Sequence, residues 1–403
     1  MNPVLKILSF SFFAFLTLSA LSQQDSHTTL TSQRQNALHL EQRGSLAAAE
    51  QAWRAIIKAA PRNAEAYAHL GLLSARRENY REAVPLYRRA LALGPGLPGI
   101  HMNLGLALFK DGKPEEAIPE FTLALNSPRV SLAEALRLRL LIGMAHYAQG
   151  QYAEAVPFLQ KAAAADPQNL PVRLVLAHSC LWSQQNQCVL DAYREIVSID
   201  PDSAEACIVA GEAMDDMKNT TGAIEQFRLA IRANPHLLGA HFGLGYLLWT
   251  QKDYDEASKE FQTELTLNPD HGQSLLYLAD VDVKANRFAE ARPLLERAER
   301  ALPSESLAHL DMGIVLTEAG QLDDATRELK EAVRLDPDDA DAHWRLSRLY
   351  RDRGDTKAAN DELAKTRELK KTEHEELYRK LANGGPQTPE LDTQFVPSQA
   401  QQR

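Results

Sequence analysis

Several functional signals are missing from this chain of 403 residues. It has no cluster of Lys and Arg, and its formal net charge is −10, which argues against nucleic acid as a partner. It has no Gly-rich loop ending in Gly-Lys-Ser or Gly-Lys-Thr, since Gly112-Lys113 is followed by a proline that would disrupt a phosphate cradle. These absences argue against a nucleic-acid-binding protein and against a nucleotide-dependent enzyme.

A complete metal-binding motif is also missing. The run from His374 to Tyr378 approaches the zinc-protease spacing, but Tyr378 replaces the second histidine, so the metal would lack a ligand. Four other histidines occupy one equivalent slot of the repeat described below, and we interpret them as packing residues: His101, His241, His309 and His343. We therefore expect no catalytic residue, no metal site and no cofactor.

Only one segment is long and apolar, from Ile7 to Leu21, and it follows Lys6. Ala20 and Ser22 are small residues at the two positions that a signal peptidase inspects, so residues 1–22 resemble a secretory signal peptide. The run is shorter than the roughly 20 residues that a membrane span needs. We expect a periplasmic or secreted protein with no membrane insertion after cleavage. The alternative is a chain anchored by an uncleaved signal.

What the sequence does contain is a repeat of thirty-four residues through most of its length. A proline marks each period at Pro61, Pro95, Pro167, Pro201, Pro235, Pro269, Pro303 and Pro337. A small residue recurs at Gly71, Gly105, Gly143, Ala177, Gly211, Gly245, Ala279, Gly313 and Ser347. Twelve residues after most of these comes an alanine, as at Ala83 and Ala117. Self-similarity at this period indicates a repeat array.

Residues 64–95 are the clearest copy, and their spacing predicts two helices. Tyr67 and Gly71 lie on one stripe of a first helix, and Ala83 and Tyr87 lie on one stripe of a second helix. Gly71 and Ala83 have almost no side chain, so the two backbones can approach closely while the tyrosines fill the space on either side. Neither helix could bury its stripe alone.

The order of large residue, Leu, Gly, aromatic, Ala, aromatic, Ala and Pro resembles the tetratricopeptide repeat signature over residues 30–373. The resemblance implies an all-α fold, a right-handed superhelical solenoid of about ten helix-turn-helix repeats. It further implies that the first helices line a concave groove that binds peptides or helices of other proteins.

A few segments depart from the pattern. Four additional residues between Ala117 and Gly143 predict a longer connection around residues 127–135, and the copy that contains Asn186 and Val189 is the weakest. After the repeats we expect a C-terminal capping helix at 374–383 and a disordered tail at 384–403, because the tail is rich in Gln, Pro, Ser and Thr.

Projection of the first helices gives a set of positions that would face the groove. They are Met102, Leu106, Phe109, Leu140, Met144, Tyr147, Glu212, Asp215, Phe242, Tyr246, Trp249 and Arg348. One interpretation is that the apolar members only pack neighbouring first helices together, and that the charged ones are solvated. For Tyr246 and Trp249 we favour partner anchoring, because large amphipathic aromatics are enriched at such sites. Glu212 and Asp215 would give this aromatic pair an acidic edge one repeat away.

Two cysteines lie on either side of a predicted turn, Cys180 late in a first helix and Cys188 early in the next helix. An oxidising compartment favours a disulfide between them, provided that the Cα atoms lie within about 7 Å. Cys207 is expected to stay a buried thiol.

The sequence thus favours an exported, non-catalytic scaffold that binds a peptide or helical segment of a partner protein. Two alternatives stay open. One is a permanent structural subunit of an envelope or export assembly, and the other is an accessory subunit of an enzyme complex such as a polysaccharide-synthesis or peptidase machinery. Purification separates the transient scaffold from the permanent subunit, since a permanent subunit co-elutes with its partner in a fixed ratio.

We predict that the mature chain begins at or near Gln23, because Ala20 and Ser22 are the best small-residue pair after the apolar run. Amino-terminal sequencing of exported material measures this directly. An intact Met1 in a membrane fraction would show an anchor instead.

Overall fold

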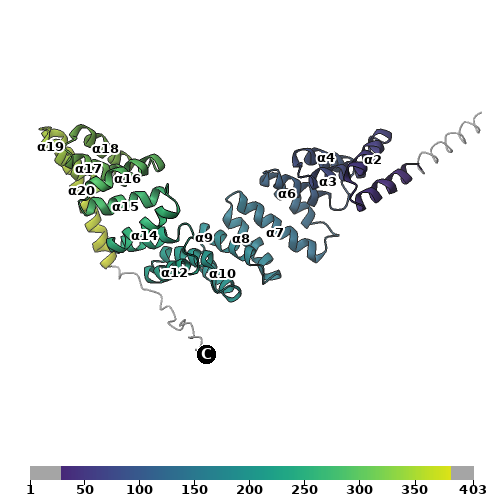
Figure 1. Ribbon diagram of the computed structural model, residues 1–403, viewed down its shortest axis with the longest axis horizontal. Helices are drawn as coiled ribbons and strands as arrows, with labels where there is room; N and C mark the ends of the chain where they lie inside the picture. The colour runs from purple at the N-terminus through teal and green to yellow at the C-terminus, as the bar shows by residue number, and fades with distance from the viewer. Residues whose placement is uncertain (1–28, 383–403) are drawn as a thin grey trace, which may run out of the picture. The chain divides into compact units, whose positions relative to one another are not determined.

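A computed structural model of the chain describes residues 29–382, and every regular element in that part is an α-helix (Figure 1). The predicted signal peptide and the predicted tail lie outside the described residues. No helix of the described part is long and apolar enough to cross a membrane. The chain divides between Asn219 and Thr220 into two units.

Unit 1 consists of helical hairpins in which a first helix packs against the second helix that follows it. Residues 29–42 form the helix that precedes α2. The first helices after it are α3 (Ala64–Arg76), α5 (Ile100–Lys110), α7 (Leu132–Ala148), α9 (Leu170–Trp182) and α11 (Ala204–Asp216). The second helices are α2 (Leu46–Ala59), α4 (Tyr80–Leu93), α6 (Pro114–Leu125), α8 (Tyr152–Ala165) and α10 (Asn186–Ile199).

Unit 2 continues the same alternation. Its first helices are α13 (Ala240–Thr250), α15 (Gly272–Lys284), α17 (Ser306–Glu318) and α19 (Ala340–Asp352). Its second helices are α12 (Thr220–Ala233), α14 (Tyr254–Leu267), α16 (Phe288–Ala301), α18 (Leu322–Leu335) and α20 (Thr356–Ala382). Consecutive first helices contact one another, α13 with α15, α15 with α17 and α17 with α19. We call the surface that these four helices form the inner face of unit 2.

Small residues allow the paired helices to approach closely, as the sequence predicts. A Cβ atom added to Gly105 would lie 2.7 Å from two ring atoms of Phe121, and Phe121 is completely buried. In the preceding hairpin a Cβ atom on Gly71 would lie 2.9 Å from the ring of Tyr87, which is also buried. The absence of a side chain at these positions therefore makes room for the largest residues of the core.

The turn inside each hairpin also repeats. One residue of the turn has a positive φ, which is +76° at Gly112 and +74° at Gly320. Glu78, Lys252 and three other non-glycine residues take the same conformation, although L-residues adopt it rarely. The backbone amide of the residue that follows donates a hydrogen bond to a carbonyl in the last turn of the first helix. In one copy, Lys113 N–H donates to Leu108 C=O at 2.9 Å. The repeat thus requires a positive φ at this turn position, and only some copies have a glycine there.

Two boundary predictions differ from the structure. The four additional residues lengthen α7 rather than the connection before it, because Ser131 and Glu134 form a capping box that starts the helix at Leu132. At the other end, α20 runs without interruption from Thr356 to Ala382. The prediction of a separate capping helix at 374–383 was therefore wrong, because those positions up to Ala382 continue the last second helix.

We expect Gly105→Ala to lower the free energy of unfolding by about 1–3 kcal/mol, because the new methyl group would overlap the buried ring of Phe121. Denaturant unfolding measures the change. Gly96→Ala is the matched control, since a Cβ atom there meets nothing within 4 Å. Equal stability of the two variants would contradict this account of helix packing.

Candidate partner-binding surface

Four aromatic side chains gather on the inner face of unit 2. Phe242, Tyr246 and Trp249 lie on α13, and Tyr277 lies on the neighbouring first helix α15. The ring centroid of Tyr277 is 4.9 Å from that of Trp249 and 5.3 Å from that of Tyr246. The rings of Tyr246 and Trp249 are stacked with centroids 6.1 Å apart. We call these four residues the aromatic shelf.

Polar contacts fix the tryptophan of the shelf. Its Nε1–H donates to Asp280 Oδ2 at 2.6 Å, and Asp280 is completely buried on α15. The other oxygen of Asp280 pairs with Lys284, whose ammonium group lies 5.5 Å from the centroid of the Trp249 ring. The indole is therefore held between a buried carboxylate and a cation.

All four shelf residues are half-buried. Tyr246 and Trp249 therefore also have a packing role, because α15 places Tyr277 against both rings, and their role as partner anchors stays a prediction. Burial also raises the pKa of the Tyr277 hydroxyl to about 12, with a further contribution from the nearby Tyr246. The shelf thus contributes to packing and at the same time exposes part of each ring.

The basic end of the predicted set lies on α19. Arg348 is exposed, and its guanidinium carbon lies 5.1 Å from the centroid of the Trp344 ring. Arg345 approaches the same ring at 5.9 Å and donates from Nε to Asp341 Oδ2 at 2.8 Å. These arginines are therefore engaged in local contacts on the inner face.

The apolar positions predicted in unit 1 are half-buried as well. Met102, Leu106 and Phe109 pack against the core that α4 to α7 share, and Leu140, Met144 and Tyr147 pack against the next core cluster. The packing interpretation accounts for most of these side chains. Tyr147 differs, because its ring lies 5.8 Å from that of Trp182, whose exposed fraction is 49 %.

The acidic pair Glu212 and Asp215 lies on α11 of unit 1. Glu212 is exposed and Asp215 is half-buried. Desolvation raises the pKa of the Glu212 carboxyl, and the negative charge of Asp216 raises it further. Because the aromatic shelf belongs to unit 2, the predicted adjacency between this pair and the shelf stays a prediction.

The four histidines of the repeat slot make a contact that the sequence reading missed. Each Nδ1 lies 2.5–2.8 Å from the carboxylate of a glutamate 19 residues later on the following second helix. The pairs are His101–Glu120, His241–Glu260, His309–Glu328 and His343–Glu362. The constant separation was visible in the sequence and could have identified them.

One of these pairs, His309–Glu328, has a second acidic residue beside it. Ligand atoms of Glu299, His309 and Glu328 lie within 4.8 Å of one another, a geometry that could hold a metal ion. Burial raises the pKa of Glu299, and the charge of Glu328 adds to the effect. The same pair forms in three repeats where an aliphatic residue replaces Glu299, namely Leu91, Ile231 and Val333. Helix packing therefore explains the His–Glu pair without a metal.

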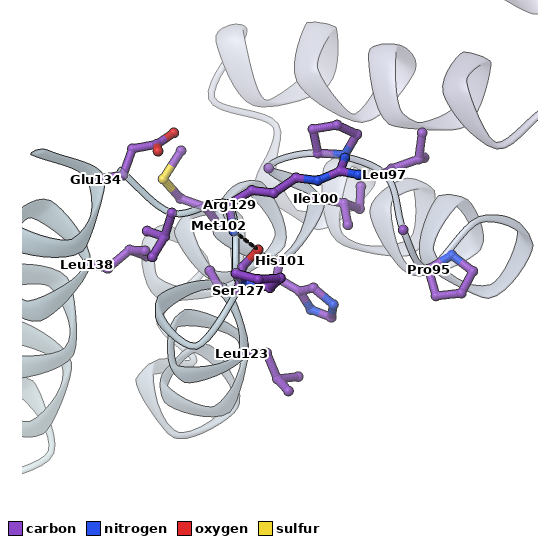
Figure 2. Close-up of a pocket in the computed structure, with 16 residues that line it drawn as sticks. Pro95, Leu97, Ile100, His101, Met102, Leu123, Ser127, Arg129, Glu134 and Leu138 are labelled. Atoms are coloured by element: carbon purple, nitrogen blue, oxygen red, sulfur yellow. Dashed lines mark hydrogen bonds between the residues drawn. The ribbon is translucent and has the colours of Figure 1, made fainter. Parts of the chain in front are cut away.

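Unit 1 contains a hollow of about 430 Å³ between the α4–α5 and α6–α7 connections (Figure 2). Met102, Leu97 and Leu138 are among the residues that line it. Leu123, at its edge, has an exposed fraction of 54 %. Apolar and polar side chains both line the hollow, and His101, Arg129 and Glu134 are among the polar ones.

Sequence reasoning also missed three polar or aromatic residues of the inner face, Tyr277, Asp280 and Asp311. The repeat register was the signal, since Gly243, Tyr277 and Asp311 follow one another at intervals of thirty-four residues. Asp280 follows Tyr246 at the same interval. The slot of Gly243, Tyr277 and Asp311 lies one residue after the one occupied by Phe242. Side chains there point toward the preceding first helix, as the contacts of Tyr277 with α13 show.

The chain belongs to the tetratricopeptide repeat family. One model of the tetratricopeptide repeat matches residues 34–98, 75–131, 102–169, 210–272, 242–306 and 276–325, and a second matches residues 316–383. The stretch outside these matches contains the copy with Asn186 and Val189. Together with the helical hairpins, this membership confirms the predicted all-α superhelical repeat fold.

Individual relatives are distant. The chain is 23 % identical to Protein O-mannosyl-transferase TMTC3 from Homo sapiens, over 73 % of this chain and 30 % of the relative. It is 25 % identical to Superkiller complex protein 3 from Mus musculus, over 74 % of this chain and 22 % of the relative. A solved tetratricopeptide repeat protein from Parabacteroides merdae aligns over 62 % of this chain and 96 % of its own, with 16 % identity and a TM-score of 0.46. The chain therefore spans less than a third of these two curated relatives.

The structure joins Cys180 on α9 to Cys188 on α10 by a disulfide, with Cα atoms 5.7 Å apart. Cys180 is completely buried and Cys188 is half-buried. The bridge spans the turn of the weakest repeat copy, where Val189 replaces the usual alanine. A covalent link at this place would stabilise the hairpin whose packing signature is least complete.

We predict this disulfide in the exported protein, and its removal by Cys180→Ala with Cys188→Ala should lower the free energy of unfolding by about 2–3 kcal/mol. Non-reducing peptide mapping identifies the bridge. Cys207→Ala should leave the bridged peptide in the map unchanged. Three unmodified thiols in the native protein would contradict the prediction.

Proposed function

We propose that this protein is an exported scaffold that binds a segment of a partner protein on the inner face of unit 2, with the aromatic shelf as the anchoring site. The observation that carries the proposal is the cluster of four half-buried aromatic rings on two consecutive first helices. Partly buried Tyr and Trp side chains at the centre of a surface supply large contact area at low entropic cost.

The structure supports this location in two ways. The hydrogen bond from Trp249 to the buried Asp280 holds the indole in one orientation, so little side-chain freedom is lost on binding. First helices also contact one another along the inner face, which gives a continuous surface for an extended or helical segment. Superkiller complex protein 3 is named as a member of a complex, which agrees with a role in protein association.

We further propose that the chain has no catalytic activity of its own and acts in the periplasm or outside the cell. Although one relative is named an O-mannosyl-transferase, the chain spans 30 % of it. The sequence contains neither a phosphate loop nor a complete zinc-protease motif. The proposed compartment rests on the amino-terminal resemblance to a signal peptide.

A permanent structural subunit is the second candidate, and unit 1 provides the observation that favours it. Leu123 and Leu132 flank the α6–α7 connection with exposed fractions of 54 % and 76 %, next to the hollow of unit 1. Exposed leucines of this kind are often covered in an assembly. Co-elution with a partner in a fixed ratio through purification would favour this candidate, and elution as a free chain would favour transient binding.

The test places a photocrosslinking amino acid at Tyr246 in the native cell. We expect one discrete adduct, and we expect Tyr246→Ala to weaken binding of the identified partner to the purified chain more than tenfold, since a central aromatic anchor contributes about 2 kcal/mol or more. Titration calorimetry measures the affinity. Because the ring also packs against Tyr277, the melting temperature should fall modestly.

Tyr254→Ala is the matched control, because Tyr254 is a half-buried tyrosine of the same unit at the start of the second helix α14. It should lose similar stability and keep the affinity of the parent. Equal affinities of parent and Tyr246→Ala would place partner binding elsewhere.

A further inference from the structure

A second hollow, of about 330 Å³, lies on the inner face of unit 2. Residues of three consecutive first helices line it, including Asp280 on α15, Asp311 on α17 and Arg345 on α19. We call it the acidic hollow. Asp280 also accepts the hydrogen bond from Trp249, so the hollow adjoins the aromatic shelf. A segment that lies on the shelf can therefore extend directly into the hollow.

Asp311 is the unusual group of this hollow. Its exposed fraction is 2 %, and within residues 29–382 its Oδ2 atom has no hydrogen-bond partner. An ionised carboxylate in such a place is costly unless a cation or several donors face it. Accordingly, burial raises the pKa of Asp311 well above its ordinary value, and the neighbouring charge of Asp280 raises it further.

Acidic groups outnumber basic groups around the hollow. The acidic residues are Asp280, Asp311, Glu318 and Asp341, and the basic ones are Lys284 and Arg345. Lys284 pairs with Asp280, while Arg345 Nε donates to Asp341 Oδ2 at 2.8 Å. Each of these two cations is thus paired with another aspartate, and no group of the described residues donates a hydrogen bond to Oδ2 of Asp311.

We propose that the acidic hollow receives a cationic side chain, an Arg guanidinium or a Lys ammonium, of the partner segment that the aromatic shelf binds. This inference rests on the proposed function and specifies the chemistry of the partner. An N–H group of the cation donates a charge-assisted hydrogen bond to Asp311 Oδ2. The segment therefore carries a basic residue close to an aromatic or aliphatic residue that contacts the shelf.

Two features favour a basic side chain over a neutral one. A cation relieves both the missing hydrogen bond of Asp311 and the repulsion between Asp311 and Asp280, whereas an amide relieves only the first. The volume of the hollow is also at the lower end of the range of small ligand pockets, which suits one side chain.

The test uses a random twelve-residue peptide library displayed on phage, selected against the purified full chain. We expect the selected peptides to share a Lys or Arg at a fixed distance from an apolar residue. One such peptide and its counterpart with Gln at the basic position are then titrated against the chain by fluorescence anisotropy. The parent should bind the basic peptide more than tenfold more tightly than the Gln peptide.

Asp311→Asn should abolish this discrimination, because it removes the charge and keeps the shape of the side chain. Its melting temperature should not fall, since no described partner of Oδ2 is lost. Asp338→Asn is the control, because it changes the same charge on an exposed residue of the α18–α19 connection. It should bind both peptides as the parent does.

The outcomes separate the two proposals. If Asp311→Asn still prefers the basic peptide, or if the parent binds both peptides equally, the acidic hollow does not receive a cation. If binding is nevertheless lost in Tyr246→Ala, the aromatic shelf keeps its proposed function. If the library yields no peptide whose binding depends on Tyr246, both proposals fail. The peptide substitution leaves the protein unchanged, so misfolding of a variant cannot imitate the result.

Discussion

The close approach of two helices at one small residue is the constraint on which this structure depends. At Gly105, Gly245 and Gly313 the space that a side chain would occupy is taken by Phe121, Phe261 and Leu329 of the following helix. Each of these large residues is almost completely buried. The approach recurs in several hairpins of each unit, and in unit 2 the consecutive first helices also contact one another.

The residues of the hairpin contacts and the residues of the inner face occupy different slots of the repeat. The small and large residues of the hairpin contact are confined to a few slots, whereas the slots of Tyr277, Asp280 and Asp311 face the neighbouring first helix on the inner face. In unit 2 these slots place aromatic rings beside buried carboxylates, the combination to which we assign the proposed partner segment.

Asp280 and Asp311 are both buried, so their carboxylate oxygens need hydrogen-bond or ion-pair partners. Asp280 is satisfied on both oxygens, by Trp249 and by Lys284, so its burial has a structural explanation. Asp311 has no such explanation, because Oδ2 lacks a partner in the described part of the chain. For stability alone, an apolar side chain would be more favourable than an unpaired buried carboxylate at that slot.

The sequence by itself determined the all-α repeat fold, the alternation of first and second helices and the slots of the small residues, because these depend on periodic local patterns and on packing between neighbours in the chain. The repeat register alone does not determine that α7 begins early or that α20 continues through 374–382, because helix ends depend on local signals such as the capping box of Ser131 and Glu134. Only the tertiary structure decided how far Tyr246 and Trp249 are buried and which aspartates meet beside them. Those properties depend on residues twenty-eight or more positions apart, and nothing in the local sequence of α13 specifies what α15 and α17 place against it.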